Sequence, residues 1–508
     1  SSNIANHFKT EFEKSGIDAS LIDISKGDIP ELPDAAGIVL VSDSFKKEPL
    51  GTSINFLKSA FLLVKKNAGY LMDSGIEKGA FLATVSFLGG GFGFSGKVFN
   101  SDPVYGGLAG LAKTANLELK NVLCRALDMP DSIEKCRKNV EAAVSLMMTH
   151  GSVEMGLDGD SCNIPDLIDQ DLNYNSLDLT SNDVVVITGG AKGVTAACAI
   201  EMAKEYSPTI VLIGRSKVPS SEPEWAKDIH DPAILKKTIL THEFKDLAPK
   251  PADIEKIYQK IISNREIQKN IQWMKEHGSN VRYFSADIRN PKEIDHIFNT
   301  IRKEFRHITA IIHGAGVLED KLIIDKQIDQ FSHVLETKVK GLDALLSVSK
   351  PDKLKYFVLF SSIAARTGNK GQCDYSMANE VLNKTAQKLA LEDSGCKFLS
   401  INWGPWEGGM VDGSLKREFL KRGIPLIPLK AGARQLLREM GNAEKNGPEV
   451  VIGAHLLNPK KSKAPKLSTA MTLSTGLTAT PVLASHMIAG EPVVPFALLM
   501  EYLAHAAE

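Results

Sequence analysis

Apolar and polar positions along this chain form two kinds of segment, short continuous apolar runs and longer stretches with helical periodicity. Residues 36–43 and 80–88 are apolar runs typical of buried strands, whereas residues 54–75 and 106–121 carry apolar side chains at a spacing of three to four, as amphipathic helices do. Strands that alternate with helices in this way predict a parallel sheet with crossover helices. We therefore expect an α/β fold for the first part of the chain.

A second and fuller series of the same kind begins at residue 184. Its predicted strands are residues 184–190, 209–216, 281–288, 308–316, 355–362 and 398–404. Helices are predicted among them at residues 192–206 and 329–349 and from about Tyr375. Because these strands are apolar throughout rather than at every second position, both faces of their sheet should be covered. This predicts a doubly wound, Rossmann-like parallel sheet.

Three segments depart from this alternation. Residues 217–280 are too long for a loop in such a fold and are helical in pattern, so we expect a helical insertion on the surface. Its charges should lie in solvent, with the docking of a partner as the alternative. Residues 458–476 are rich in Lys, Ser, Thr and Pro, which is the composition of a linker. Residues 477–508 form a short third element.

The composition narrows the class of protein. A chain of 508 residues is too long for one ordinary core, so two or three domains are expected. A formal net charge of -1 gives no electrostatic footprint for nucleic acid or an anionic membrane, and the sequence has neither a bilayer-spanning apolar run nor a signal pattern. Six cysteines without C-x-x-C spacing indicate reduced thiols of a cytoplasmic protein rather than disulfides or a metal site. The missing initiator Met and an end inside a helical pattern indicate a piece of a longer protein.

Two glycine-rich stretches compete as the phosphate loop of a dinucleotide site. GGGFGFSG, at residues 89–96, contains a literal G-x-G-x-x-G, but Pro103 and its polar neighbours delay the next helix. A phosphate loop needs the amino terminus of a helix directly after the turn, because free N–H groups and the helix dipole bind the pyrophosphate. We therefore assign these glycines to turns or packing.

TGGAKGVT, at residues 188–195, meets this requirement. An apolar strand leads into it and helical periodicity starts at once, with Gly189 and Gly193 allowing the sharp turn and the close approach of a phosphate. The next strand ends in Arg215 and Ser216, where an enzyme that uses NAD would carry an acid, which favours the 2′-phosphate of NADPH. A cofactor-free sheet with a glycine turn is the alternative.

The motifs VITGGAKGV, GRS, ADI, HGAG, FSSIA and YSMAN stand in the order and approximate spacing of the short-chain dehydrogenase/reductase superfamily, which the chain resembles. Free-standing members carry Tyr-x-x-x-Lys, whereas here Asn379 follows Tyr375 and the lysine is found in an earlier helix, as Lys338. This exchange is similar to the ketoreductase domains of modular polyketide and type I fatty acid synthases. INWGPWEGGM, at residues 401–410, is similar to their cofactor-side lid, and the insertion with EPEW looks most like that of bacterial polyunsaturated fatty acid synthases.

The resemblance implies an organisation for the whole chain. Residues 1–175 would be a truncated, cofactor-free structural subdomain, and residues 183–457 the catalytic subdomain, which binds NADPH. The substrate would be a β-ketoacyl thioester tethered through phosphopantetheine to an acyl carrier protein, with other synthase domains as neighbours. Two alternatives remain, a catalytically silent scaffold of the same fold and a free-standing reductase or epimerase that acts on a small molecule.

Four residues are the catalytic candidates that the resemblance implies, and the chemistry asks for the same types. Reduction of a ketone by hydride leaves negative charge on oxygen, which requires an acid and hydrogen-bond donors. Tyr375 would donate the proton, Ser362 would bind the same carbonyl, and Asn379, one helical turn from Tyr375, would position a relay water or the lysine. The ammonium of Lys338 would lower the pKa of Tyr375 by favouring its charged form.

The cofactor contacts that the resemblance implies lie in four segments. They are Gly189, Gly190, Ala191, Lys192, Gly193, Val194, Arg215, Ser216, Asp287, Ile288, Gly314, Ala315 and Gly316. Thr195 stands where relatives often have a third glycine, which would alter helix packing without removing the phosphate site. His313, which precedes GAG, is expected to be structural.

One motif bears on the product. Leu318-Glu319-Asp320 resembles the L-x-D feature of ketoreductases that give D-configured hydroxyls, and Thr367 stands where the opposite class carries Trp. The resemblance therefore implies a (3R)-hydroxyacyl product.

The last segment contains a second motif. His486-x-x-x-Gly490-x-x-x-x-Pro495 looks like the histidine motif of hot-dog dehydratases, and an apolar helical pattern follows it. Dehydration also needs an acid, which the family carries on a second hot-dog half. We therefore expect residues 477–508 to have no activity of their own and to be the start of a dehydratase-like domain, with a piece retained for its packing as the alternative.

Overall fold

The structure is a computed structural model that describes most of the chain. It covers residues 3–42, 45–159, 161–169, 176–217, 222–245, 249–409, 417, 419, 421, 424–442, 447–453, 487–488 and 491–492. The chain divides into two compact units, Ser1–Ala454 and His455–Glu508. In the second unit β13 (Met487–Ile488) pairs with β14 (Glu491–Pro492) in antiparallel fashion. The expected linker and His486 lie outside the described residues, so the hot-dog element stays a prediction.

A five-stranded sheet organises the first part of the chain. Its strands lie in the order β1 (Gly37–Val41), β2 (Ala80–Ser86), β3 (Val122–Asp128), β4 (Glu154–Asp158) and β5 (Ser161–Asn163). All pairs are parallel except that of β4 with β5. The helices are α1 (Asn3–Lys14), α2 (Leu50–Glu77), α3 (Gly107–Glu118) and α4 (Ile133–Met148). Leu82 packs under α2 and α3, whereas the next residue, Ala83, packs under α1 and α4, so helices cover both faces.

A seven-stranded parallel sheet follows. Its order is β12 (Glu449–Ile452), β11 (Lys397–Trp403), β10 (Tyr356–Ser362), β9 (Ala310–His313), β6 (Val184–Thr188), β7 (Thr209–Gly214) and β8 (Val281–Ser285). Its helices include α5 (Gly193–Tyr206), α8 (Pro291–Phe305), α9 (Ile328–Ser349), α10 (Ile363–Thr367), α11 (Cys373–Glu392) and α13 (Leu429–Gly441). The strand order reverses between β6 and β9, and open α/β sheets bind ligands at the carboxyl ends of the strands at such a point. The doubly wound, Rossmann-like fold class is confirmed.

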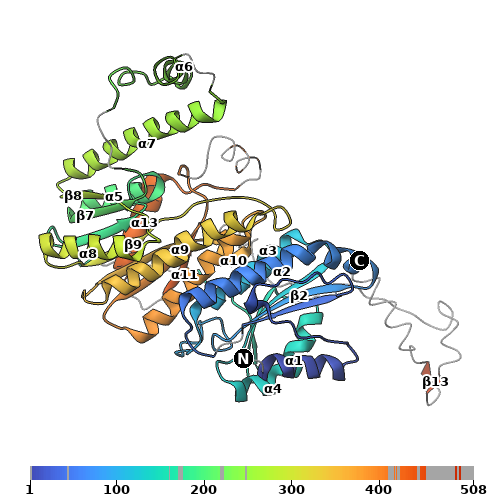
Figure 1. Cartoon of the computed structure of the whole chain (residues 1–508). Helices are drawn as coiled ribbons and strands as arrows, with labels where there is room; N and C mark the ends of the chain where they lie inside the picture. Colours follow the sequence, from blue (N-terminus) through green and yellow to red (C-terminus); the bar gives the residue numbers. More distant parts are fainter. Residues whose placement is uncertain are drawn as a thin grey trace. The chain divides into compact units, whose positions relative to one another are not determined.

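The segment between β7 and β8 is helical, as its pattern predicts, and consists of α6 (Pro232–Glu243) and α7 (Pro251–Glu276) (Figure 1). Leu235 and Ile239 of α6 form a small core with Ile261 of α7. The later half of α7 departs from the prediction of a surface insertion. Ile267 and Met274 are buried in the main core with α5, because this half serves as the crossover helix that leads into β8.

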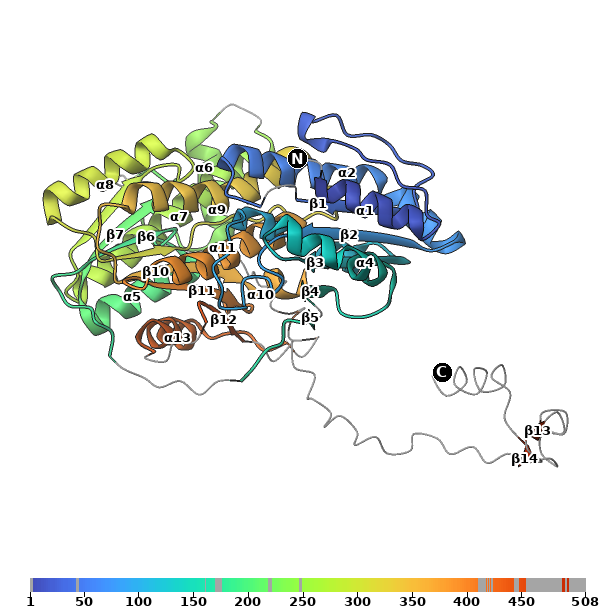
Figure 2. The ribbon, with the colours of Figure 1, turned by 90° about the horizontal axis from the view of Figure 1, so that it is seen from below.

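Helix α11 lies between the two sheets, against helices of both (Figures 1 and 2). On one side it packs on β10 and β11, and on the other it meets α3. A β-carbon placed on Gly110 of α3 would lie 2.6 Å from the backbone nitrogen of Met377 of α11. Close by, the ring of Phe61 on α2 stacks on Phe331 of α9, with 4.2 Å between centroids. The first sheet and its helices therefore provide the surface against which the helix that carries Tyr375 packs.

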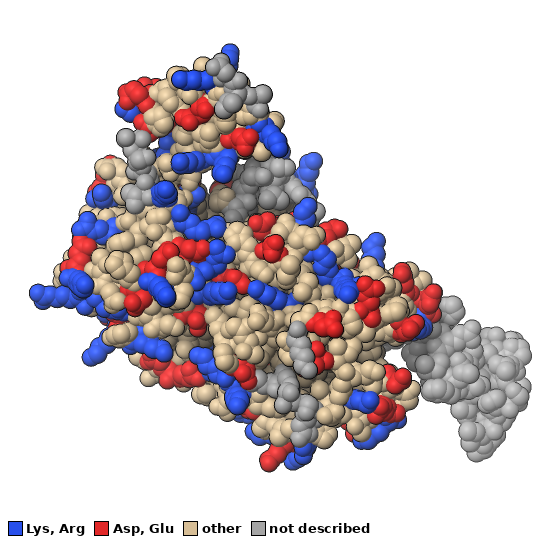
Figure 3. Space-filling view, in the orientation of Figure 1, with Lys and Arg blue, Asp and Glu red and all other residues tan. Residues whose placement is uncertain are grey.

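The structure also shows how charged side chains are distributed and in which state the cysteines are. Among the described residues, none of the helices combines the length and apolar character needed to cross a membrane. Basic and acidic side chains are interspersed over the face shown in Figure 3. All six cysteines are free thiols, and five of them are buried.

Candidate active site

Three of the four predicted catalytic residues meet where β10 ends and α11 begins. Tyr375 lies in the first turn of α11 and is half-buried. Ser362 ends β10 and caps α10, where its Oγ accepts a hydrogen bond from the Ala364 nitrogen at 3.2 Å. Asn379 Nδ2 donates to the Tyr375 carbonyl at 2.8 Å. Asn379 Oδ1 is buried and has no hydrogen-bond partner among the described residues.

Lys338 approaches the same place from α9. Its side chain is buried, and its Nζ lies 5.4 Å from the centroid of the Tyr375 ring while it donates to the Phe360 carbonyl at 2.7 Å. A β-carbon on Gly316 would lie 3.1 Å from the Lys338 side chain, so the HGAG loop borders the amine. Burial lowers the pKa of Lys338 to about 7. All four predicted catalytic residues are thus brought together.

The pKa of Tyr375 differs from the expectation that Lys338 lowers it. Burial is the largest effect and raises this pKa, Asp320 raises it further, and hydrogen bonds with Asn379 and Ser362 lower it. The physical reason is that a buried phenolate is poorly solvated, while the neighbouring amine loses charge for the same cause. The arrangement therefore keeps Tyr375 in its protonated form, which is the form that donates a proton.

His313 connects the glycine turn to the lysine helix. Its Nε2 must donate to the Lys338 carbonyl at 3.0 Å, since a carbonyl oxygen only accepts. Its Nδ1 then accepts from the Thr188 hydroxyl at 2.8 Å, and the same hydroxyl accepts from the Ala315 nitrogen at 3.2 Å. Burial and the nearby ammonium of Lys338 lower the pKa of His313 to about 3, so the ring is neutral. These bonds give His313 the structural role expected of it.

The TGGAKGVT stretch folds as strand, turn and helix without a gap. Thr188 ends β6 and α5 begins at Gly193, whose φ is 61°. Gly189, with a φ of 71°, passes so close to the HGAG loop that a β-carbon would lie 3.0 Å from the Ala315 nitrogen. Thr195, which replaces a third glycine, packs directly over Gly314. The turn therefore has the geometry in which a helix amino terminus faces an anion.

The predicted adenosine end is built around two arginines. Arg215 Nη1 lies 3.0 Å from Nε2 of His333, and the carboxylate of Asp287 pairs with Arg289, with 2.6 Å between Nη2 and Oδ2. The pKa of Asp287 is lowered, mainly by its hydrogen bonds with Arg289. Ile288 is buried. His333 and Arg289 were missed from the sequence, because neither belongs to a motif.

The other glycine stretch serves packing. The carboxylate of Asp128 accepts hydrogen bonds from the nitrogens of Leu88 and Phe92, at 2.6 and 2.7 Å, and so fixes the turn at the end of β2. A β-carbon on Gly93 would lie 3.2 Å from the side chain of Gln387 on α11. The helix α3 begins only at Gly107. This loop therefore supports α11 instead of facing a phosphate with a helix.

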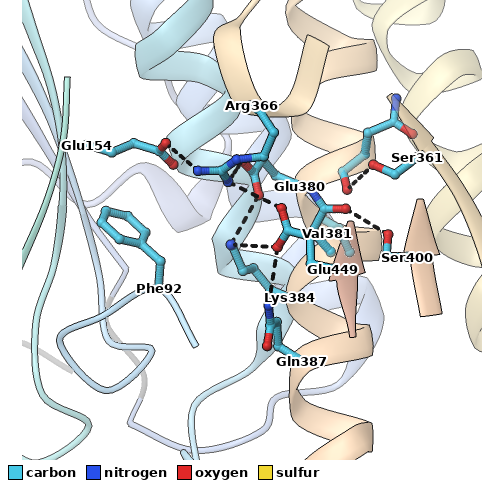
Figure 4. Close-up of polar contacts among 12 residues, drawn as sticks. Phe92, Glu154, Ser361, Arg366, Glu380, Val381, Lys384, Gln387, Ser400 and Glu449 are labelled. Atoms are coloured by element: carbon cyan, nitrogen blue, oxygen red, sulfur yellow. Dashed lines mark hydrogen bonds and ion pairs between the residues drawn. The ribbon is translucent and has the colours of Figure 1, made fainter. Parts of the chain in front are cut away.

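A buried cluster of ion pairs joins both sheets to α11 (Figure 4). It contains three cations and three carboxylates, from Lys113, Arg366, Lys384, Glu154, Glu380 and Glu449. Arg366 Nη2 lies 2.7 Å from Glu154 of the first sheet, and Nη1 lies 2.9 Å from Glu380, the residue after Asn379. The charges balance, which is the condition for burying them. Sequence patterns could not reveal the cluster, because its members come from several separate elements.

The Leu318-Glu319-Asp320 segment is tied to the start of α11. Gln372 Nε2 donates to Asp320 at 2.9 Å, and the buried Lys326 donates both to the Glu319 carbonyl at 2.6 Å and to Asp374 at 2.8 Å. Asp374 directly precedes Tyr375, so this segment and the phenol are fixed relative to each other.

A carboxylate of the first half binds two loops next to Tyr375. Glu118, at the end of α3, accepts hydrogen bonds from the nitrogens of Ile323 and Gly371, at 2.6 and 2.7 Å. Burial raises the pKa of Glu118. Nothing in the sequence around Glu118 marks it, because its partners lie more than 200 residues further along the chain.

Comparisons with known proteins agree with this arrangement. Residues 184–408 match the profile of the family described as KR domain. The chain is 32% identical over 418 residues to a chain of the polyunsaturated fatty acid synthase of Thraustochytrium sp. and 28% identical over 280 residues to the polyketide synthase PksN of Bacillus subtilis. These alignments cover 78% and 54% of this chain, but only 14% and 4% of the relatives. The chain thus spans a small part of each relative.

Solved structures show the same fold. An N-terminal ketoreductase from the macrolactin assembly line aligns with a TM-score of 0.62 at 19% identity, covering 89% of this chain and 84% of that one. A ketoreductase domain from the bacillaene assembly line aligns with a TM-score of 0.60 at 20% identity, covering 84% and 94%. With the family profile, the relatives and the fold in agreement, the chain contains a ketoreductase (KR) domain at residues 184–408, of the kind found in type I polyketide and polyunsaturated fatty acid synthases.

Proposed function

We propose that this domain reduces a β-ketoacyl thioester, carried by an acyl carrier protein, to the (3R)-hydroxyacyl thioester with NADPH. The observation that carries the proposal is the convergence of Tyr375, Ser362, Asn379 and Lys338 beside the turn that precedes α5. Proton donor, hydrogen-bond donor and buried amine are the groups that ketone reduction needs at one oxygen.

The residues of the glycine turn fit a dinucleotide. The backbone N–H groups at the start of α5 would hold the pyrophosphate, with Gly189 and Gly193 leaving room for it. Arg215 would hold the 2′-phosphate, since no carboxylate occupies the end of β7 and a guanidinium matches a phosphate geometrically. When bound, NADPH supplies the hydride.

The remaining steps belong to the side chains of this domain. The substrate ketone accepts hydrogen bonds from Ser362 and Tyr375, and the phenol transfers its proton to the oxygen as negative charge develops there. A phenol whose pKa burial has raised remains protonated until that charge appears. Lys338, whose lowered pKa of about 7 still leaves part of it protonated near neutral pH, then stabilises the phenolate in its ammonium form. Asn379 Oδ1 accepts a hydrogen bond from the relay water or from Lys338, whichever returns the proton.

The orientation of the substrate would follow from the segment bound to α11. Asp320 and Glu319 are held at the start of this helix by Gln372 and Lys326, which supports their proposed part in selecting the 3R product. The alcohol configuration is tested by chiral analysis after reduction of a short β-ketoacyl thioester. Mainly 3S product would contradict this assignment.

Activity is tested by NADPH oxidation with such a thioester, in wild type and Tyr375→Phe. The variant should lose activity by at least about a hundredfold, the usual effect of a general acid, and should bind NADPH as wild type does. Equal oxidation rates in both proteins would refute the role of Tyr375. Absence of turnover in wild type with normal NADPH binding would favour a silent scaffold, and preference for sugar nucleotides or free ketones would favour a free-standing reductase.

The organisation of the chain is proposed with the function. Residues 1–175 would act as the structural subdomain and residues 183–457 as the catalytic one, with other synthase domains as neighbours. Glu154 and Glu118 contact residues of the proposed catalytic subdomain, which supports the proposal that this subdomain depends on the structural one.

A further inference from the structure

The later half of α7 lies along the glycine turn. Asn270 of α7 is buried, and its Nδ2 donates to the carbonyl of Ala191 at 3.0 Å. One turn earlier, Ile267 is buried in the core shared with α5. The same helix also carries Ile261, which belongs to the small core of α6. The single helix α7 therefore extends from the small core that it forms with α6 to the predicted cofactor site (Figure 1).

Two more residues on this face of α7 reach the turn. Ser263 Oγ accepts a hydrogen bond from Lys192 Nζ at 2.7 Å, and Glu266 Oε1 accepts one from the backbone nitrogen of Gly193 at 2.9 Å. Positions 263, 266 and 270 are spaced three and four apart, so they lie on one side of the helix. Through them α7 contacts three consecutive residues of the turn, from Ala191 to Gly193.

Glu266 contacts a backbone N–H group that would itself bind an anion. The nitrogen of Gly193 is the first of α5 and has no partner within that helix, and it lies at the positive end of the helix dipole. A carboxylate there is well placed in the absence of a cofactor. It also brings a negative charge to the position that a pyrophosphate requires, and two anions at one donor repel each other.

We propose that Glu266 is a displaceable stand-in for the pyrophosphate and that it determines cofactor affinity. Its carboxylate closes the glycine turn while the site is empty of dinucleotide and leaves the Gly193 nitrogen when NADPH binds. Part of the binding free energy is spent on this displacement, so affinity is lower than the turn alone would give. This inference rests on the proposed function, because it requires that the TGGAKGV turn binds a dinucleotide.

The test is the dissociation constant of NADPH, measured by the change in its fluorescence on binding. Glu266→Gln keeps a side-chain oxygen for the Gly193 nitrogen and removes only the charge. We expect it to bind NADPH about three- to tenfold more tightly than wild type, in the range typical of one screened charge near a helix amino terminus. Glu255→Gln, on the same helix but paired with Lys236, is the matched control and should leave the constant unchanged.

A second ligand makes the effect specific to the pyrophosphate. Adenosine 2′-monophosphate lacks the pyrophosphate, so its affinity should be the same for wild type and Glu266→Gln. Equal NADPH affinity in both proteins, or weaker binding by Glu266→Gln, would overturn the inference while leaving the proposed function intact. Equal tightening for both ligands would also overturn it, because the effect would then not come from the pyrophosphate position. NADPH binding to none of the proteins would overturn the proposed function, and with it this inference.

Discussion

Gly110 of α3 and Met377 of α11 touch backbone to backbone, since a β-carbon on the glycine would lie 2.6 Å from the methionine nitrogen. Met377 stands two residues after Tyr375 on the same helix. The first part of the chain, which carries none of the predicted site residues, therefore fixes the position of α11 on the second sheet.

This contact predicts opposite effects for two glycine-to-alanine changes. Gly110→Ala should destabilise the protein by about 1–3 kcal/mol, the usual cost of overpacking, and lower kcat, because α11 must shift. Gly69→Ala, in α2, meets nothing within 4 Å and should stabilise by up to about 1 kcal/mol through helix propensity. Urea unfolding and NADPH oxidation measure both. A neutral Gly110→Ala would show that α3 and α11 do not touch at this point.

The ion cluster predicts a large cost for removing one charge. Glu154→Gln leaves three cations facing two carboxylates in a buried site, and a loss of about 3–5 kcal/mol in the free energy of unfolding is expected. The control is Glu13→Gln, whose partner Lys9 is exposed, where less than about 1 kcal/mol is expected. Adding Lys113→Met to Glu154→Gln should recover part of the loss by restoring balance. Equal costs for the two single variants, measured by urea unfolding, would contradict burial of the cluster.

The lowered pKa of Lys338 predicts a pH dependence of stability. This pKa is 10.5 in the unfolded chain and about 7 in the folded protein, so between these values the folded state binds fewer protons. The free energy of unfolding should therefore rise with pH in this window, by up to about 1.4 kcal/mol per pH unit from this group. Lys338→Met removes the contribution.

Urea titrations of wild type and Lys338→Met at pH 7 and pH 9 measure this difference. Wild type should gain stability relative to the variant at the higher pH, while the variant lacks reductase activity at both. A difference that stays the same between pH 7 and pH 9 would mean that Lys338 remains charged in the folded protein.

Arg215 predicts the choice between NADPH and NADH. Arg215→Ala should weaken NADPH binding by about ten- to a hundredfold, because a hydrogen bond to a charged group contributes about 1.5–3 kcal/mol, and should leave NADH binding unchanged. Arg282→Ala is the control, since Arg282 pairs with Glu304 on the exposed surface. Equal loss for both cofactors would place the 2′-phosphate elsewhere, with Arg289 as the next candidate.

The sequence allowed the sheets and the grouping of the site to be predicted, because these depend on local patterns. A continuous apolar run leads into the turn at Thr188, and helix periodicity follows it directly. The same reasoning separated this turn from the stretch at Gly91 and Gly93, whose next helix begins too late. The order of the motifs then pointed to Tyr375 and Lys338 as catalytic candidates. In the structure Nζ of Lys338 lies 5.4 Å from the centroid of the Tyr375 ring.

Contacts between distant segments could not be predicted. In the sequence Glu266 is one of many charged residues of a polar helix. Only the packing of the neighbouring Ile267 against α5 shows that Glu266 contacts Gly193. The raised pKa of Tyr375 likewise depends on how deeply the fold buries it, which no motif states. Long-range packing and the electrostatics that follow from it are the parts that required the structure.

Glu118 has a consequence for moving this domain between synthases. Its one carboxylate binds the amides of Ile323 and Gly371, on loops near Tyr375, from a helix that precedes the second sheet in the chain. A graft that starts at residue 183 would leave both amides facing a foreign surface. The transplantable unit is therefore the pair of halves, and a chimera that keeps α3 with its own loops should retain turnover where a shorter swap fails.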